Sequence, residues 1–76
     1  MIYVLNEVDS NSNETTIGVF NTTEISDGKL AEYYGDKFET LDYRDISDSQ
    51  LEWQKVIKCD GERLTLTLHS FLINEL

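Results

Sequence analysis

The chain has 76 residues and carries fifteen acidic side chains against six basic ones, a formal net charge of -9. A charge of this sign repels nucleic acid and anionic membranes and attracts basic partners, so it argues against direct binding to either polyanion. With 39% hydrophobic residues and eight aromatics, the chain is too apolar for a disordered acidic tail. Its length suits one small core, so we expect a single domain over residues 1–76.

Cysteine content and hydropathy bear on where the protein functions. Cys59 is the single cysteine and has no internal disulfide partner, and no basic segment leading into an apolar run opens the sequence. This pattern favours a cytoplasmic protein over a secreted disulfide scaffold. The apolar runs at residues 2–5 and 71–73 are far shorter than the ~20 residues of a membrane-spanning helix. We therefore expect a soluble protein.

The first twenty-one residues predict a β-hairpin. Residues 2–5 form a continuous β-prone run, which indicates a central strand covered on both faces, and residues 15–21 have a similar character. Residues 9–14 separate them with short polar side chains that compete for backbone hydrogen bonds and favour a turn. We expect Val4 and Val19 to lie in the core of this hairpin.

Residues 22–35 predict a short helix. Cap-type residues, Ser26 among them, stand near the beginning, and Gly35 lies where a left-handed C-terminus is expected. The apolar positions form a stripe that includes Leu30. Gly28 weakens the helix interior by up to about 1 kcal/mol, so the first turn is the weakest part.

The strongest local signal is Asp60-Gly61, because this dipeptide readily adopts the positive φ angles of a type I′ hairpin turn. A two-residue turn sets Cys59 opposite Glu62 and thereby fixes the register of both strands. One face of this hairpin then contains the predicted core residues Trp53, Ile57, Leu64, Leu66 and Leu68.

On the opposite face, the same register places Val56 beside Thr65 and Glu52 beside His69, and we expect this face to be largely exposed. A rival interpretation makes Ser47 the N-cap of a helix, with Trp53 and Val56 at helical spacing. The sequence leaves open whether residues 47–58 form a strand or a helix, and the Asp-Gly turn favours the strand.

Residues 38–46 alternate weakly and predict an exposed or edge strand. Together the elements predict an α+β fold with the order ββαβββ, a mainly antiparallel sheet of about five strands, and one helix packed on one face. The predicted buried set is Val4, Val19, Leu30, Trp53, Ile57, Leu64, Leu66 and Leu68.

The acidic residues are unevenly distributed. Residues 1–50 hold eleven acids and three bases, whereas residues 51–76 hold four acids and three bases. Carboxylates two residues apart on one strand face lie about 6.6 Å apart, close to the spacing of successive phosphates, so an acidic strip can imitate a nucleic-acid backbone. A period of three instead sends alternate acids to opposite strand faces, so charge that serves only solubility stays as the alternative. The candidate partner-binding residues are Asp36, Glu39, Asp42, Tyr43, Asp45 and Asp48, with Tyr43 as the amphipathic anchor.

The sequence offers little for catalysis or metal binding. His69 is the sole histidine and Cys59 the sole cysteine. Two such ligands are too few for a zinc site. Asp9 opens an imitation of a calcium loop, but Glu14 stands where that loop needs glycine and Phe20 where it needs glutamate. We expect no catalytic residue, no cofactor and no metal, and therefore not an enzyme.

Three features of the first 45 residues resemble a class of small uncharacterised phage and bacterial domains. They are the opening residues 2–5, the strand at residues 18–20 ahead of a Thr-capped helix, and the later acidic strand. The resemblance implies an α+β fold and origin in a mobile element, with no functional residue to carry over.

The interpretation we favour is a small acidic, non-enzymatic binding protein, a phage or mobile-element inhibitor that occupies a basic, nucleic-acid-binding surface of a host protein. One alternative is a self-associating assembly module that forms a homodimer through a strand edge. A second alternative is a small metal-dependent enzyme.

Overall fold

The computed structural model describes residues 1–35, 37–48 and 50–71. The elements follow the predicted order ββαβββ, which places the chain in the α+β class. In chain order they are β1 (Ile2–Val8), β2 (Glu14–Phe20), α1 (Asp27–Tyr34), β3 (Phe38–Asp48), β4 (Leu51–Cys59) and β5 (Glu62–Phe71).

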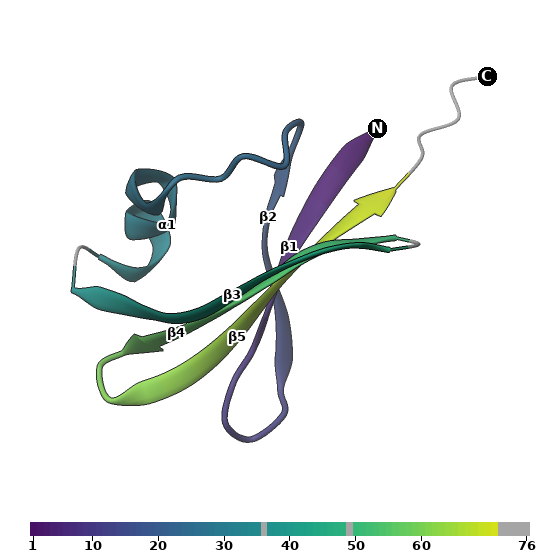
Figure 1. Cartoon of the computed structure of the whole chain (residues 1–76). Coiled ribbons are helices and arrows are strands. Elements are labelled where there is room, and N and C mark those ends of the chain that lie inside the picture. Colours follow the sequence, from purple (N-terminus) through teal and green to yellow (C-terminus); the bar gives the residue numbers. More distant parts are fainter. Residues whose placement is uncertain (36, 49, 72–76) are drawn as a thin grey trace.

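The five strands form one antiparallel sheet in the order β2-β1-β5-β4-β3. The predicted hairpin at residues 1–21 is confirmed as the pair β1 and β2, and β1 is a central strand because β5 pairs along its other side. The edges are β2 and β3, so the prediction of an edge strand after the helix is also confirmed. Figure 1 shows α1 to one side of this twisted sheet.

The Asp-Gly turn produces the predicted hairpin of β4 and β5. Asp60 and Gly61 have φ angles of 53° and 78°, the left-handed values that a type I′ turn requires at both central residues. Cys59 faces Glu62, and the predicted pairs of Ile57 with Leu64, Lys55 with Leu66 and Trp53 with Leu68 are all present. The rival helix at residues 47–58 is wrong, because this segment contains β4.

One predicted pair on this hairpin is wrong. Leu51, rather than Glu52, is the partner of His69, since the register shifts between Leu51 and Trp53. Glu52 is the extra residue of a β-bulge, which a strict two-residue period cannot anticipate. The ring of His69 instead lies beside Thr67, with 3.2 Å between Nε2 and Oγ1.

The core lies between one face of the sheet and α1. Its buried side chains are Leu5, Ile25, Leu30, Trp53, Ile57, Leu64, Leu66 and Leu68. Six of the eight predicted core residues are therefore buried.

The two exceptions are Val4, which is half-buried, and Val19, whose side chain is 60% exposed. These valines face each other across β1 and β2. Leu5, next to Val4, is fully buried, so the pleat sends both valines to the opposite face of the sheet. The expectation that Val4 and Val19 lie in the core is wrong for this reason, whereas β1 is at least half-buried along its whole length.

The face of the sheet opposite the core is not exposed to solvent everywhere. Val56 is only 7% exposed, contrary to the expectation for that face, and its partner Thr65 is half-buried. Val8 pairs with Thr65 from the other side and is itself half-buried. Neighbouring side chains on three adjacent strands therefore shield one another without help from a helix.

The helix begins later than its predicted segment at residues 22–35. Ser26 is the N-cap, and its hydroxyl accepts a hydrogen bond from the Lys29 N–H at 3.1 Å. Gly35 ends the helix with a φ of 75° and a ψ of 179°, so the expected positive φ is present but the backbone is extended rather than left-handed helical, a conformation open almost only to glycine. Before Ser26 the chain is not helical, since the carbonyl of Thr23 accepts a hydrogen bond from the indole of Trp53. The core therefore fixes where the helix begins.

Candidate partner-binding surface

The edge strand β3 carries several exposed acidic side chains close together. Apart from Phe38 and Ile46, which are half-buried, its side chains are exposed. It bears four acids, Glu39 among them, and a single base, Arg44. One side of β3 pairs with β4, and the other side is the edge of the sheet. An exposed edge of this charge repels a second acidic edge and attracts a basic one.

A bulge in β3 changes the faces on which the acids lie. The register shifts between Thr40 and Asp42, so Glu39 pairs with Lys58 and Asp42 pairs with Val56. Lys58 and Val56 are two residues apart on β4 and share a face, so Glu39 and Asp42 share it as well. The expected alternation of period-three acids between opposite faces is therefore wrong for this pair.

A second shift, between Asp45 and Asp48, brings Asp48 opposite Leu51. Leu51 pairs with His69, whose side chain lies on the face opposite the core, so Asp48 joins the two acids above on that outer face. Asp36, the remaining acid of the series, lies outside the described residues.

Tyr43 and Asp45 lie on the other face of β3, the one that meets α1. Their partners on β4 are Lys55 and Trp53. The rings of Tyr43 and Trp53 lie 6.0 Å apart between centroids, and Tyr43 remains 53% exposed. The structure thus divides the sequence-predicted residues between two faces, three acids on one and a tyrosine with one acid on the other.

Two of the three outer-face acids have basic neighbours. Asp42 accepts a charged hydrogen bond from Arg44 Nε at 3.2 Å, and Glu39 is the cross-strand partner of Lys58. Both members of the Asp42 pair are exposed, so the pair contributes little to stability, but it lowers the net charge of that face.

A pocket of about 270 Å³ lies on the inner face, where β3 and β4 meet the segment that precedes α1. We call it the carboxylate pocket, because the acids Glu24, Asp45 and Glu52 line it together with the rings of Tyr43 and Trp53. Within residues 1–35, 37–48 and 50–71, none of these three carboxylates forms an ion pair. Asp45 accepts a hydrogen bond of 2.7 Å from the Ser47 hydroxyl. Lys55 also lines the pocket, but its ion pair is with Asp27, so the three carboxylates have no direct basic partner among the described residues.

Sequence reasoning did not include Glu24 or Glu52 among the candidate partner-binding residues. Glu24 precedes the helix and Glu52 is the bulged residue of β4, so neither follows the period of three. The Thr23–Trp53 hydrogen bond and the bulge in β4 place Glu24 and Glu52 in the same pocket. No local sequence pattern predicts this hydrogen bond or this bulge.

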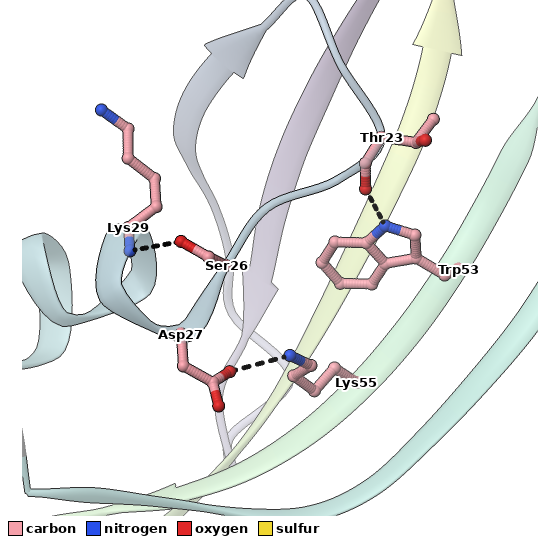
Figure 2. A network of polar contacts seen from close by, with 6 residues as sticks. All are labelled: Thr23, Ser26, Asp27, Lys29, Trp53 and Lys55. Carbon is pink, nitrogen blue, oxygen red and sulfur yellow. Dashed lines mark hydrogen bonds and ion pairs between the residues drawn. The ribbon is translucent and has the colours of Figure 1, made fainter.

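Polar contacts hold the wall of the carboxylate pocket in place (Figure 2). Trp53 Nε1 donates to the carbonyl of Thr23 at 2.9 Å, which ties β4 to the segment before α1. Lys55 Nζ lies 3.2 Å from Asp27 Oδ1, which ties β4 to the first turn of the helix. The Lys55 side chain is only 12% exposed, so this ion pair is shielded on one side.

Lys55 also makes contact with the aromatic wall. Its Nζ lies 5.8 Å from the centroid of the Tyr43 ring and 5.8 Å from that of Trp53, within the range of cation–π interactions. The two rings therefore already have one positive charge beside them.

The pKa of the Cys59 thiol is shifted in the direction opposite to that of an activated, nucleophilic cysteine. Partial desolvation and the carboxylates of Asp60, Glu7 and Glu62 raise the pKa of Cys59, which keeps it protonated. Over the described ranges, no three His, Cys, Asp or Glu side chains are grouped so that they could hold a metal ion.

No helix in the described part of the chain is both long and apolar enough to cross a membrane. No family model, no curated protein and no solved structure matches this chain. The resemblance to small phage and bacterial domains stays a prediction.

Proposed function

We propose that this protein is a small non-enzymatic binding protein that occupies a basic surface on another macromolecule, such as a nucleic-acid-binding groove of a host protein. The observation that supports this most directly is β3, an exposed edge strand with four acids and one base. The carboxylate pocket adds three acids that form no ion pair among the described residues, against one base, Lys55, which is paired with Asp27.

The net charge of -9 would act first, by steering a basic partner toward the acidic side of the molecule. Exposed aromatic residues are frequent anchors at interfaces, and Tyr43 lies on β3 with its ring half uncovered. Charge steering is screened beyond about 8 Å at physiological ionic strength, so the association rate must fall as salt is added.

The test begins with capture of partners from host lysate at low and then high salt, followed by purification of the protein that elutes. Its association rate with the acidic protein is then measured by surface plasmon resonance over a series of salt concentrations. We expect the rate to fall steeply with salt. We also expect it to fall in the triple variant Asp42→Asn, Asp45→Asn, Asp48→Asn, which removes three charges from β3.

A matched triple variant controls for net charge alone. Glu14→Gln, Glu32→Gln and Asp60→Asn remove the same number of charges from β2, α1 and the β4–β5 turn, and all three side chains are exposed. The control should slow association less than the β3 variant does. A salt-insensitive rate, or equal effects of the two triple variants, would contradict a β3-centred mechanism.

Self-association is the second candidate, and the distribution of charge favours β2 as its edge. Pairing of β3 with a second β3 would bring acids together, whereas β2 carries a single acid, Glu14, and the exposed Val19. Light scattering over a range of concentrations tests this candidate. A concentration-dependent dimer that Val19→Lys abolishes would support it, and a monomer at every concentration would exclude it.

A further inference from the structure

We infer that the carboxylate pocket seats an arginine side chain of the basic partner, an inference that rests on the proposed function and specifies its contact chemistry. The pocket combines the two features that bind a guanidinium: aromatic faces and uncompensated carboxylates. Its volume of about 270 Å³ accommodates a side-chain head group rather than a folded element.

The position of Lys55 demonstrates that the aromatic wall accepts a cation. The ammonium lies 5.8 Å from the centroids of both Tyr43 and Trp53. Lys55 is committed to Asp27 at 3.2 Å, so this pair is close to electrically neutral. The remaining acids of the pocket are therefore free to attract a second positive charge from outside.

The remaining acids reach the pocket from different elements. Asp45 follows Tyr43 by two residues, so the two side chains project from the same face of β3. Glu24 enters from the segment before α1 and Glu52 from the bulge of β4. A cation placed against the exposed Tyr43 ring would thus have carboxylates contributed by three separate parts of the chain.

Arginine fits these groups better than lysine does. A guanidinium is planar, so it can stack on the Tyr43 ring while its N–H groups point sideways toward a carboxylate such as that of Asp45. An ammonium is a compact and strongly hydrated charge, and it loses more hydration when it enters a partly enclosed pocket. A metal ion is a poor alternative, because the described carboxylates are not grouped closely enough to ligate one.

The first experiment uses three synthetic pentapeptides that differ only in the central residue, which is arginine, lysine or citrulline, flanked by glycine and serine. Citrulline keeps the shape of arginine without its charge. Binding is followed by two-dimensional NMR of the 15N-labelled protein, with the Trp53 indole N–H as the reporter inside the pocket. We expect saturable shifts at Trp53 and Tyr43 with the arginine peptide, weaker ones with lysine, and none with citrulline.

Two single variants on the same strand separate the pocket from general charge attraction. Asp45→Asn and Asp42→Asn each remove one charge from β3, but Asp45 lines the carboxylate pocket whereas Asp42 lies on the outer face. Loss of one charge-assisted contact should weaken arginine-peptide binding by about fivefold in Asp45→Asn and by less than about twofold in Asp42→Asn. Glu52→Gln provides an independent pocket variant with the same expected direction, and the dispersion of the NMR spectra confirms that each variant folds.

Equal losses in the two variants, or no saturable shift at Trp53, would overturn the pocket as the arginine seat. That outcome leaves the proposed function intact if association with the captured partner still depends on salt and on the β3 triple variant. Absence of any salt-dependent partner would contradict the proposed function itself, while the peptide experiment would still decide whether the pocket binds arginine.

Discussion

Replacement of Trp53 tests both the core and the wall of the carboxylate pocket. Its side chain is 5% exposed and packs in the core, and its indole N–H donates to the carbonyl of Thr23. Trp53→Ala removes the whole ring, whereas Trp53→Phe keeps an aromatic ring but loses the hydrogen bond. Comparison of the two variants therefore separates the contribution of packing from that of the hydrogen bond to the segment before α1.

Truncation of a buried tryptophan to alanine costs about 3–5 kcal/mol. A single core in a domain of fewer than about 80 residues supplies a similar free energy of unfolding, about 3–5 kcal/mol. We therefore expect Trp53→Ala to be largely unfolded at 25 °C. Trp53→Phe should lose about 1–3 kcal/mol, from the smaller ring and from the Thr23 carbonyl that loses its donor.

The free energy of unfolding is measured by urea denaturation followed by circular dichroism, because Trp53 is the only tryptophan and its fluorescence disappears in both variants. Tyr43→Ala is the matched control, since this ring touches Trp53 yet is half exposed, and it should cost less than about 1 kcal/mol. A Trp53→Ala variant that keeps the wild-type midpoint would refute the placement of Trp53 in the core.

Three further predictions concern single groups. The hydroxyl of Tyr34 is buried near the Glu7 carboxylate and makes no hydrogen bond of good geometry among the described residues. Tyr34→Phe should therefore raise the free energy of unfolding by up to about 1 kcal/mol, and a loss on urea denaturation would show that the hydroxyl bonds to Glu7 instead. The backbone N–H groups of Asn13 and Asn11 hold the pKa of Asp9 below its ordinary value of 3.8. Because the pKa of Asp9 is lower in the folded state, its ionisation stabilises the protein above pH 3.8, and this stabilisation is lost as the pH falls through the folded-state pKa. The free energy of unfolding of wild type should therefore fall more steeply than that of Asp9→Asn between pH 5 and pH 2. Parallel curves for the two proteins would contradict this prediction. Gly61→Ala should cost about 1–2 kcal/mol because φ is 78°, and an unchanged urea midpoint would argue against the type I′ turn.

The hairpin of β4 and β5 was predictable pair by pair, because an Asp-Gly turn leaves a single register and the pattern of Leu64, Leu66 and Leu68 agrees with it. Prediction failed where a residue is inserted. The bulge at Glu52 moves His69 to a new partner, and the bulge after Thr40 moves Asp42 to the face of Glu39. Both bulges depend on how strands fit together across the sheet, which the local sequence does not encode.

The core of the N-terminal hairpin was less predictable for a different reason. Residues 2–5 are apolar without alternation, so the pattern gives no indication of which face is buried. The structure assigns Leu5 to the core and leaves Val4 and Val19 on the other face. The choice is made by the pairing of Leu5 with Leu68 on β5, a contact between residues far apart in the sequence.

The candidate surface was predictable in composition but not in geometry. The excess of acids and the exposure of the third strand followed from the sequence. The gathering of Glu24, Asp45 and Glu52 in one pocket depends on a hydrogen bond between Trp53 and Thr23, thirty residues away. Tertiary contacts of this kind decide which of many carboxylates are neighbours.

The adjacency of β1 and β5 in the middle of the sheet has a consequence for the speed of folding. Each hairpin closes over a short stretch of chain, but they are joined only when Leu5 meets Leu68, near opposite ends of the sequence. Bringing such distant segments together costs loop entropy before any burial compensates for it, so this pairing is expected to limit the rate. On a chain emerging from the ribosome, the hairpin of β1 and β2 would therefore lack its neighbour in the sheet until β5 is released.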